Sequence, residues 1–270
     1  MRTKQRVYIT GGSSGIGLSL AIRYARNGDE VILLARNQDK LDEAAGLCRA
    51  ETLSANQLIA GVSLDISEFK ALAVKMKAIT DEYGQPDLLI LSAGIAGNKT
   101  FLDMKSEEFD TMMALNFSAS REMARCVLPA MLERSHGQIA FISSTAGLMG
   151  VYGYSAYCAS KYAVTGFVMA LQQELYGTGV CATLVCPSEV ATPLIAAEAA
   201  SVLPQTRLLK DLGGTLSPEK AAEIIFKGIR NKKSIVKTGF VAHVFDFTYR
   251  VFPWLYRKIT QITIWYAGRK

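Results

Sequence analysis

The sequence predicts an α/β fold in which one doubly wound parallel sheet carries helices on both faces. The main observation is that short apolar, strand-like runs alternate with longer helix-like segments from the first residues onward. A second is the glycine-rich turn between the first apolar run and the first helix. A third is that 270 residues suit one large domain, and we find no repeat, low-complexity tract or long linker that divides them.

Strand-like runs occupy six segments, which are 7–9, 31–34, 58–64, 88–91, 138–142 and 180–185. Between them lie helical patterns, among them 67–83 and 106–132, and Asn37 and Ser217 stand where N-terminal caps are expected. Repeated strand-helix alternation predicts parallel strands, since a helical crossover returns the chain to the same edge of the sheet.

Composition and charge exclude several classes of function. Half of the residues are hydrophobic and 20% are charged, which argues against disorder. The five cysteines form no Cys-x-x-Cys pair, so we expect reduced thiols in a cytoplasmic protein. His136 and His243 are far apart without ligand-spaced neighbours, so we expect neither a metal site nor a histidine-based triad. We recognise no targeting sequence and no transmembrane helix.

Tyr157 and Lys161 are the first candidates for chemistry. They stand four residues apart in a helix-compatible run and therefore share one face near the helix N-terminus. An adjacent cation favours the ionised form of a phenol, which would make Tyr157 an acid or base near neutral pH. The spacing alone is also compatible with a packed tyrosine beside a solvated lysine.

The glycine turn Gly11-x-x-x-Gly15-x-Gly17 follows the first strand and opens the first helix. Such a turn lets the backbone approach a pyrophosphate group, which then sits at the positive helix N-terminus. Its spacing differs from the commoner G-x-G-x-x-G, and alone it could be a structural turn. Its position between a strand and a helix favours a nucleotide site.

Together these motifs resemble the short-chain dehydrogenase/reductase family. The residues that carry the resemblance are Thr10 with the glycine turn, Ser92-Ala93-Gly94, Asn116, Ser144 thirteen residues before Tyr157, and Lys161. The match runs in one register from about residue 5 to 195. It implies a Rossmann-type fold with a bound nicotinamide cofactor.

The resemblance also implies a role for each residue. Tyr157 would give a proton to a carbonyl oxygen, and Lys161 would hold the nicotinamide ribose while lowering the tyrosine pKa. Ser144 would hydrogen-bond the substrate oxygen, and Asn116 would hold a proton-relaying water. The expected cofactor contacts are Thr10, Gly11, Ser13, Ser14, Gly15, Ile16, Gly17, Arg36, Lys40, Asp65, Ser92, Ala93, Gly94, Tyr157, Lys161, Pro187, Val190 and Thr192. Ser92 and Ser188 replace the family's usual Asn and Gly, which affects local geometry.

Charge at the end of the second strand predicts the cofactor. A carboxylate there binds the ribose hydroxyls of NAD, whereas an arginine meets the additional phosphate of NADP. This chain has Arg36, nineteen residues after Gly17, with Lys40 one helical turn further on. We therefore predict NADPH.

Substrate class depends on the segment after Thr192. Residues 193–214 are rich in Ala and Leu and are typical of an apolar lid. This segment and its surroundings look most like the 3-ketodihydrosphingosine reductases, in their bacterial form because the membrane segment of eukaryotic versions is not found here. That resemblance implies reduction of a long-chain ketone, most favourably 3-ketodihydrosphingosine. The alternatives are a steroid, retinal or 3-oxoacyl thioester carbonyl, or a non-catalytic NADPH sensor or scaffold.

We divide the single domain into a catalytic part, residues 1–235 with the lid, and a basic aromatic extension, residues 236–270. From Lys227 onward, ten Lys or Arg accompany one acid. The extension combines Phe245, Tyr249, Phe252, Trp254, Tyr256, Ile259, Ile262, Trp265 and Tyr266 with Arg250, Arg257, Lys258, Arg269 and Lys270. This pattern suits a helix at the inner face of a membrane, or aromatic packing on the protein body.

Two further expectations concern partners. Family analogy suggests a homodimer or homotetramer through the helices that contain Asn116 and Tyr157. Nucleic acid is excluded as a partner, because the basic residues lie away from the predicted sheet and match no recognition motif.

Overall fold

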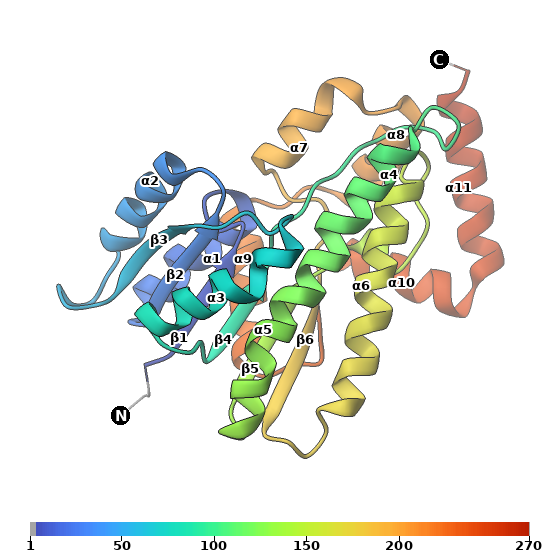
Figure 1. Ribbon diagram of the computed structural model, residues 1–270. Helices are drawn as coiled ribbons and strands as arrows, with labels where there is room; N and C mark the ends of the chain where they lie inside the picture. The colour runs from blue at the N-terminus through green and yellow to red at the C-terminus, as the bar shows by residue number, and fades with distance from the viewer. Residues whose placement is uncertain (1–3, 270) are drawn as a thin grey trace.

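The computed structural model describes residues 4–269, which form one seven-stranded parallel sheet between two layers of helices (Figure 1). The strand order is β3-β2-β1-β4-β5-β6-β7. In chain order the strands are β1 (Arg6–Thr10), β2 (Glu30–Ala35), β3 (Ile59–Ser63), β4 (Leu88–Leu91), β5 (Gly137–Ile142), β6 (Val180–Cys186) and β7 (Ile235–Lys237). The expected doubly wound sheet is confirmed.

Helices alternate with the strands and continue beyond the last one. They are α1 (Gly15–Arg26), α2 (Gln38–Arg49), α3 (Phe69–Tyr83), α4 (Ser106–Met113), α5 (Ala119–Glu133), α6 (Ser155–Glu174), α7 (Pro193–Glu198), α8 (Pro204–Gly213), α9 (Pro218–Arg230), α10 (Phe240–Val251) and α11 (Pro253–Ala267). Both expected caps are present: Asn37 Oδ1 accepts the Lys40 N–H at 2.8 Å, and Ser217 Oγ accepts the Lys220 N–H at 3.2 Å.

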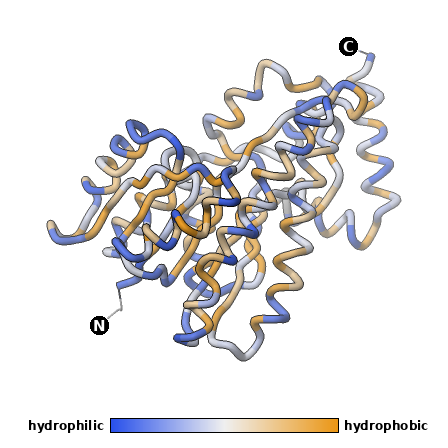
Figure 2. The backbone as a smooth tube through the Cα atoms, viewed as in Figure 1, coloured by the Kyte–Doolittle hydropathy of each residue, from blue (hydrophilic) through white to orange (hydrophobic). Residues whose placement is uncertain are grey.

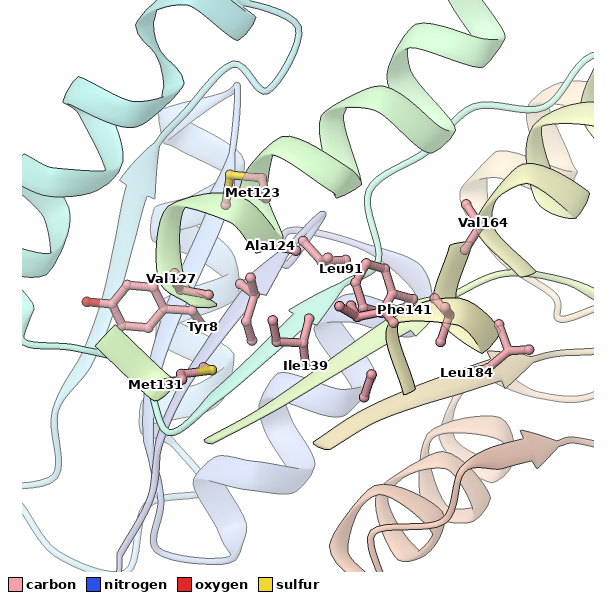
Figure 3. Close-up of a cluster of buried hydrophobic side chains, with 14 of the residues drawn as sticks. Tyr8, Leu91, Met123, Ala124, Val127, Met131, Ile139, Phe141, Val164 and Leu184 are labelled. Atoms are coloured by element: carbon pink, nitrogen blue, oxygen red, sulfur yellow. The ribbon is translucent and has the colours of Figure 1, made fainter. Parts of the chain in front are cut away.

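Two hydrophobic cores lie on opposite faces of the sheet, because successive side chains along each strand point to opposite sides. The core under α3, α5 and α6 includes Tyr8, Leu91, Met123, Val127, Ile139, Phe141 and Val164 (Figure 3). The core under α1, α2 and α9 includes Val7, Ile9, Leu20, Leu41, Ile90, Ala140 and Ile225. Burial on both faces explains why the strands are apolar at nearly every position, as the hydropathy colouring shows (Figure 2).

The strand order reverses beside β1, which has β2 on one side and β4 on the other. Crossovers that leave in opposite directions open a crevice at the carboxyl ends of these strands, and ligands of open α/β sheets bind in such crevices. The glycine turn follows β1 and the Ser92-Ala93-Gly94 segment follows β4. The fold therefore brings these two predicted cofactor segments together.

The long helix predicted over 106–132 contains an irregularity that the sequence pattern did not reveal. Between α4 and α5 the chain forms a π-helical turn over Ala114–Ser118, and Asn116 lies at its centre. Single π-helical turns inside α-helices occur frequently at functional sites. The turn leaves the helix continuous but changes the direction in which the Asn116 side chain points.

The C-terminal region begins with a strand that the sequence analysis did not predict. The strand β7 was not predicted, because its three residues are too few for a periodic pattern, and the boundary that we set at residue 236 falls inside it. It pairs with β6 at the edge of the sheet. Beyond it, α11 packs against α8 and α10 at one side of the molecule (Figure 1). Within residues 4–269 we find no helix that is long and apolar enough to cross a membrane.

Candidate active site

A cleft of about 250 Å³ opens at the carboxyl ends of β1, β4, β5 and β6. Its lining includes the turn after β1, the loop after β4, the start of α6 and the start of α7, which belongs to the segment predicted to be a lid. Most predicted site residues line it: Gly11, Ser14, Gly15, Ile16, Ser92, Ala93, Gly94, Ser144, Tyr157, Lys161, Pro187, Val190 and Thr192. The cleft is thus the place where the predicted motifs meet the segment that follows Thr192.

The turn after β1 tolerates only glycine at its tightest point. A Cβ atom on Gly17 would lie 2.3 Å from the carbonyl oxygen of Gly11, a distance at which something must move. Gly11 and Gly15 have positive φ angles of 66° and 54°, a region that favours glycine. The N-terminus of α1 therefore reaches the cleft with its backbone uncovered, which suits a pyrophosphate group.

Thr10 supports this turn from behind instead of lining the cleft. Its hydroxyl oxygen accepts the backbone N–H groups of Ser92 at 3.1 Å and of Ala93 at 3.2 Å, and only 2% of the residue is exposed. These bonds fix the loop after β4 against the end of β1. The serine that replaces the family's usual Asn thus keeps its backbone hydrogen bond.

Asn116 joins the loop after β4 to the helix that carries the tyrosine. Its Oδ1 accepts the N–H of Ile95 at 2.8 Å, and its Nδ2 donates to the Ile95 carbonyl at 2.9 Å. The same Nδ2 donates to Ser160 Oγ at 2.9 Å. With 1% of the residue exposed, this side chain has a positioning function in addition to any contact with water.

Lys161 is buried at the end of β5. Its Nζ donates to the carbonyl oxygen of Ile142 at 3.0 Å and lies 5.7 Å from the centre of the Tyr157 ring. Ser143 fastens the same helix, because its hydroxyl donates to the Lys161 carbonyl at 3.0 Å. The pair predicted from an i, i+4 spacing therefore lies side by side in the cleft, next to Ser144.

The acidity of this pair differs from the sequence-based expectation. Burial raises the pKa of Tyr157 to about 12, although the Ser144 side chain opposes this by hydrogen bonding. Burial also lowers the pKa of Lys161 from 10.5 to about 8. Desolvation is thus the largest cause of both pKa shifts. The expected depression of the tyrosine pKa by its lysine was wrong for the protein without a cofactor.

The other predicted residues lie outside the cleft lining. Arg36 and Lys40 are exposed beyond the end of β2, and Asp65 follows β3. The pKa of Asp65 is lowered, first by hydrogen bonds from Ser67 and in smaller part by Arg36. The charge of Arg36 therefore reaches the region where an adenosine ribose would lie at the end of β2.

Comparison with known proteins assigns the family. The model of short chain dehydrogenases matches residues 5–202. The chain belongs to this family. It is therefore an oxidoreductase, and the Rossmann-type fold expected from the motifs is confirmed.

Relatives within the family include reductases of sphingoid ketones. The 3-ketodihydrosphingosine reductase of Bos taurus is 34% identical over 222 residues, which are 82% of this chain and 67% of the relative. The 3-dehydrosphinganine reductase TSC10B of Arabidopsis thaliana is 36% identical over 88% of this chain and 70% of its own. A structure of a variant actinorhodin polyketide ketoreductase with NADPH has a TM-score of 0.77 at 27% identity, covering 90% of this chain and 99% of that one.

A cluster of four hydrogen-bonded or ion-paired residues at the wall of the cleft of this short-chain dehydrogenase was not predicted from the sequence. They are Tyr154, Glu189, Glu198 and Lys210, of which all but Glu198 line the cleft. Lys210 and Glu198 stand in the Ala- and Leu-rich lid segment, where a charged residue that becomes buried is unusual. Those charges were the signal, but sequence periodicity does not reveal which of them face inward.

The exposed Arg36 provides a test of cofactor recognition. Arg36→Ala is expected to weaken NADPH binding by about tenfold, because a charge-assisted bond to the ribose phosphate is lost. NADH binding should change little. Fluorescence titration with NADPH and with NADH measures the ratio of the two affinities. Arg26→Ala is the control, because Arg26 is an exposed arginine at the C-terminal end of α1 that pairs with Glu51. An unchanged preference would refute the role of Arg36.

Burial of Lys161 predicts a pH-dependent cost to stability. At pH 7 the lysine is charged in the folded and unfolded chain, so folding carries the full penalty of desolvation. Lys161→Met should therefore raise the free energy of unfolding by about 1–3 kcal/mol, after subtraction of the lost hydrogen bond. As pH rises from about 8 towards 10.5, the wild-type lysine becomes neutral and this advantage shrinks.

Urea unfolding at pH 7 and pH 10 measures the difference. Lys77→Met, at a lysine with 74% of its side chain exposed, is the matched control and should show no such trend. An advantage of the methionine variant that grows with pH would contradict the assignment.

Proposed function

We propose that this protein is an NADPH-dependent reductase of a long-chain apolar ketone, and that this ketone is 3-ketodihydrosphingosine. The observation that carries the proposal is the similarity to sphingoid ketone reductases over more than four fifths of the chain, combined with Ser144, Tyr157 and Lys161 in one cleft. Cofactor and catalytic residues would then act as follows.

The residues of the turn after β1 fit NADPH, because only an uncovered backbone would let a pyrophosphate approach the start of α1. When bound, NADPH supplies the hydride that reduces the carbonyl carbon. Lys161, whose Nζ lies close to Gly94, would hold the nicotinamide ribose. Arg36 would bind the ribose phosphate.

Tyr157 then provides the proton. Because burial raises its pKa to about 12, the phenol keeps its proton at neutral pH, and a proton donor is what ketone reduction requires. Ser144 would hydrogen-bond the carbonyl oxygen and hold it near the phenol. Asn116 holds the loop after β4 against α6, the helix that carries Tyr157.

A second cavity of about 110 Å³ supports a long apolar substrate. It shares Thr145, Val151, Ser188, Glu189 and Lys210 with the main cleft and therefore adjoins it. Its apolar lining comes from Met149, Leu209, Phe245 and Ile259, so that α8, α10 and α11 all contribute to it. Apolar walls beside a polar reaction centre suit a ketone with an alkyl chain.

The alternatives are another carbonyl substrate and a protein without turnover. A steroid, retinal or 3-oxoacyl thioester would also fit apolar walls. A non-catalytic NADPH sensor or scaffold would need the glycine turn but not the complete set of Asn116, Ser144, Tyr157 and Lys161. That set therefore favours catalysis.

Turnover tests the proposal directly. Purified protein is expected to oxidise NADPH in the presence of 3-ketodihydrosphingosine in detergent, measured by the loss of NADPH absorbance. Tyr157→Phe removes the proton donor and should lower kcat by about 100-fold or more, while NADPH still binds.

A steroid ketone, retinal and an acetoacetyl thioester serve as competing substrates. Turnover of one of these in place of the sphingoid ketone would retain the mechanism and reject the substrate. NADPH binding without turnover of any ketone would instead favour the sensor.

We also propose that α10 and α11 attach the protein to the cytoplasmic face of a membrane. Phe245 and Tyr256 pack inward, with ring centres 6.5 Å apart, as the alternative of internal packing predicted. Other apolar side chains face outward: Phe240, Phe247, Trp254, Ile262 and Trp265 are 57–82% exposed. Arg257, Lys258 and Arg269 lie among them and would meet anionic lipid, whereas Lys270 lies outside the described residues.

Vesicle binding tests this attachment without disturbing the cavity. Replacing both Trp254 and Trp265 by Ser should weaken binding to anionic vesicles by about tenfold or more, since two exposed indoles can no longer insert. Tyr176→Ser, at a side chain that is 91% exposed at the end of α6, is the control. Equal sedimentation of all three proteins with vesicles would refute the attachment.

Assembly into a homodimer or homotetramer stays a prediction.

A further inference from the structure

A buried polar cluster joins the lid to the wall of the cleft beside Tyr157. The Tyr154 hydroxyl donates to Glu198 Oε2 at 2.5 Å, and Lys210 Nζ lies 3.3 Å from the same oxygen. Lys210 also pairs with Glu189 Oε2 at 2.6 Å. The ring centres of Tyr154 and Tyr157 are 5.5 Å apart. The cluster is therefore adjacent to the proposed proton donor.

The three charged side chains of this cluster are almost completely shielded from water. The exposed fractions are 4% for Glu198, 8% for Glu189 and 11% for Lys210. Two carboxylates thus share one ammonium group. The surplus of negative charge lies inside the protein, where screening is weak.

The surrounding charges offset this surplus only in part, through Arg207, whose charge opposes the rise in the pKa of Glu198. Arg207 lies 3.8 Å from Glu189 Oε1 and also 3.8 Å from Asp211. The side chains of Arg207 and Asp211 are far more exposed than those of the cluster. Glu189 Oε1 accepts in addition from the Thr215 hydroxyl at 3.0 Å. Arg207 and Asp211 therefore largely balance each other at the rim.

Two carboxylate oxygens of the cluster, Glu189 Oε2 and Glu198 Oε1, accept no hydrogen bond from residues 4–269, although Glu189 Oε2 forms the ion pair with Lys210. Glu198 Oε1 is buried and has no hydrogen-bond partner among the described residues. Burial raises the pKa of Glu198 and lowers the pKa of Lys210, the directions expected where desolvation outweighs pairing. A buried carboxylate with a missing partner costs stability, and a reductase of neutral ketones would gain nothing in return.

We propose that Glu189, which lines the cleft, binds the ammonium group of an amino-ketone substrate whose carbonyl is held at Tyr157, and that Glu198 adds negative charge from behind the cleft wall. This inference rests on the proposed function and specifies its substrate class. In 3-ketodihydrosphingosine the amino group is carried by the carbon next to the carbonyl. Charge and carbonyl are therefore adjacent in the substrate, and in the cleft the cluster adjoins Tyr157 through Tyr154.

The cluster also explains discrimination against the competing carbonyls. A steroid or retinal offers no cation, so its binding would leave the carboxylates without a partner. A thioester on a phosphate-bearing carrier would bring further negative charge towards them. Selectivity of this kind arises from a buried charge that only the correct ligand compensates.

Comparison of two ketones tests the inference in the unmodified protein. One is the 2-amino-3-ketone with a long alkyl chain, and the other carries a hydroxyl in place of the amino group. We expect kcat/KM to be about tenfold or more higher for the amino ketone, as for one charge-assisted hydrogen bond. Glu198→Gln and Glu189→Gln should each reduce this ratio several-fold.

Glu223→Gln is the matched control, because Glu223 also pairs with one lysine, Lys227 at 2.6 Å, but is exposed. Its ratio should equal that of the unmodified protein. Equal turnover of the two ketones by the unmodified protein would overturn the inference and leave the proposed reductase intact. Absence of turnover of either ketone would reject the proposed function itself, and the ammonium site with it.

Discussion

The hydrogen bond from Lys161 Nζ to the carbonyl oxygen of Ile142 is the contact on which the rest of the site depends. It attaches the first turns of α6 to the end of β5, and Ser143 strengthens the same junction through the Lys161 carbonyl. Since α6 also carries Tyr157 and Ser160, this junction sets the position of the phenol and of the partner of Asn116. The same hydrogen bonds therefore attach α6 to the sheet and position the side chains of the site.

Burial gives this junction its chemical character. An ammonium group inside the protein is a weaker base than in water, and a phenol inside the protein is a weaker acid. At neutral pH the Tyr157 phenol therefore keeps its proton, whereas the Lys161 ammonium group loses its proton more easily than it would in water. Stability is given up for this arrangement, as is common where a buried charge serves a reaction.

Much of this architecture could be predicted from sequence because its signals are local. The alternation of apolar runs fixed the sheet, and the glycine turn and the Tyr157–Lys161 spacing located the cleft. Long-range features could not be predicted in the same way. The three residues of β7 form a strand only because β6 offers an open edge. The Glu198–Lys210 pair exists only because α7 and α8 fold against Tyr154. The raised pKa of Tyr157 depends on burial, which spacing does not report.

The helix α11 has one further consequence. Its inner face, with Tyr256, Ile259 and Thr260, lines the second cavity, while Trp254, Ile262 and Trp265 face outward. A wall one helix thick, about 10 Å, therefore separates this cavity from the surroundings. Helices with few buried side chains, such as α11, open locally at a lower free energy than the core of a domain. Local opening of α11 would therefore admit molecules to the cavity while the sheet stays folded.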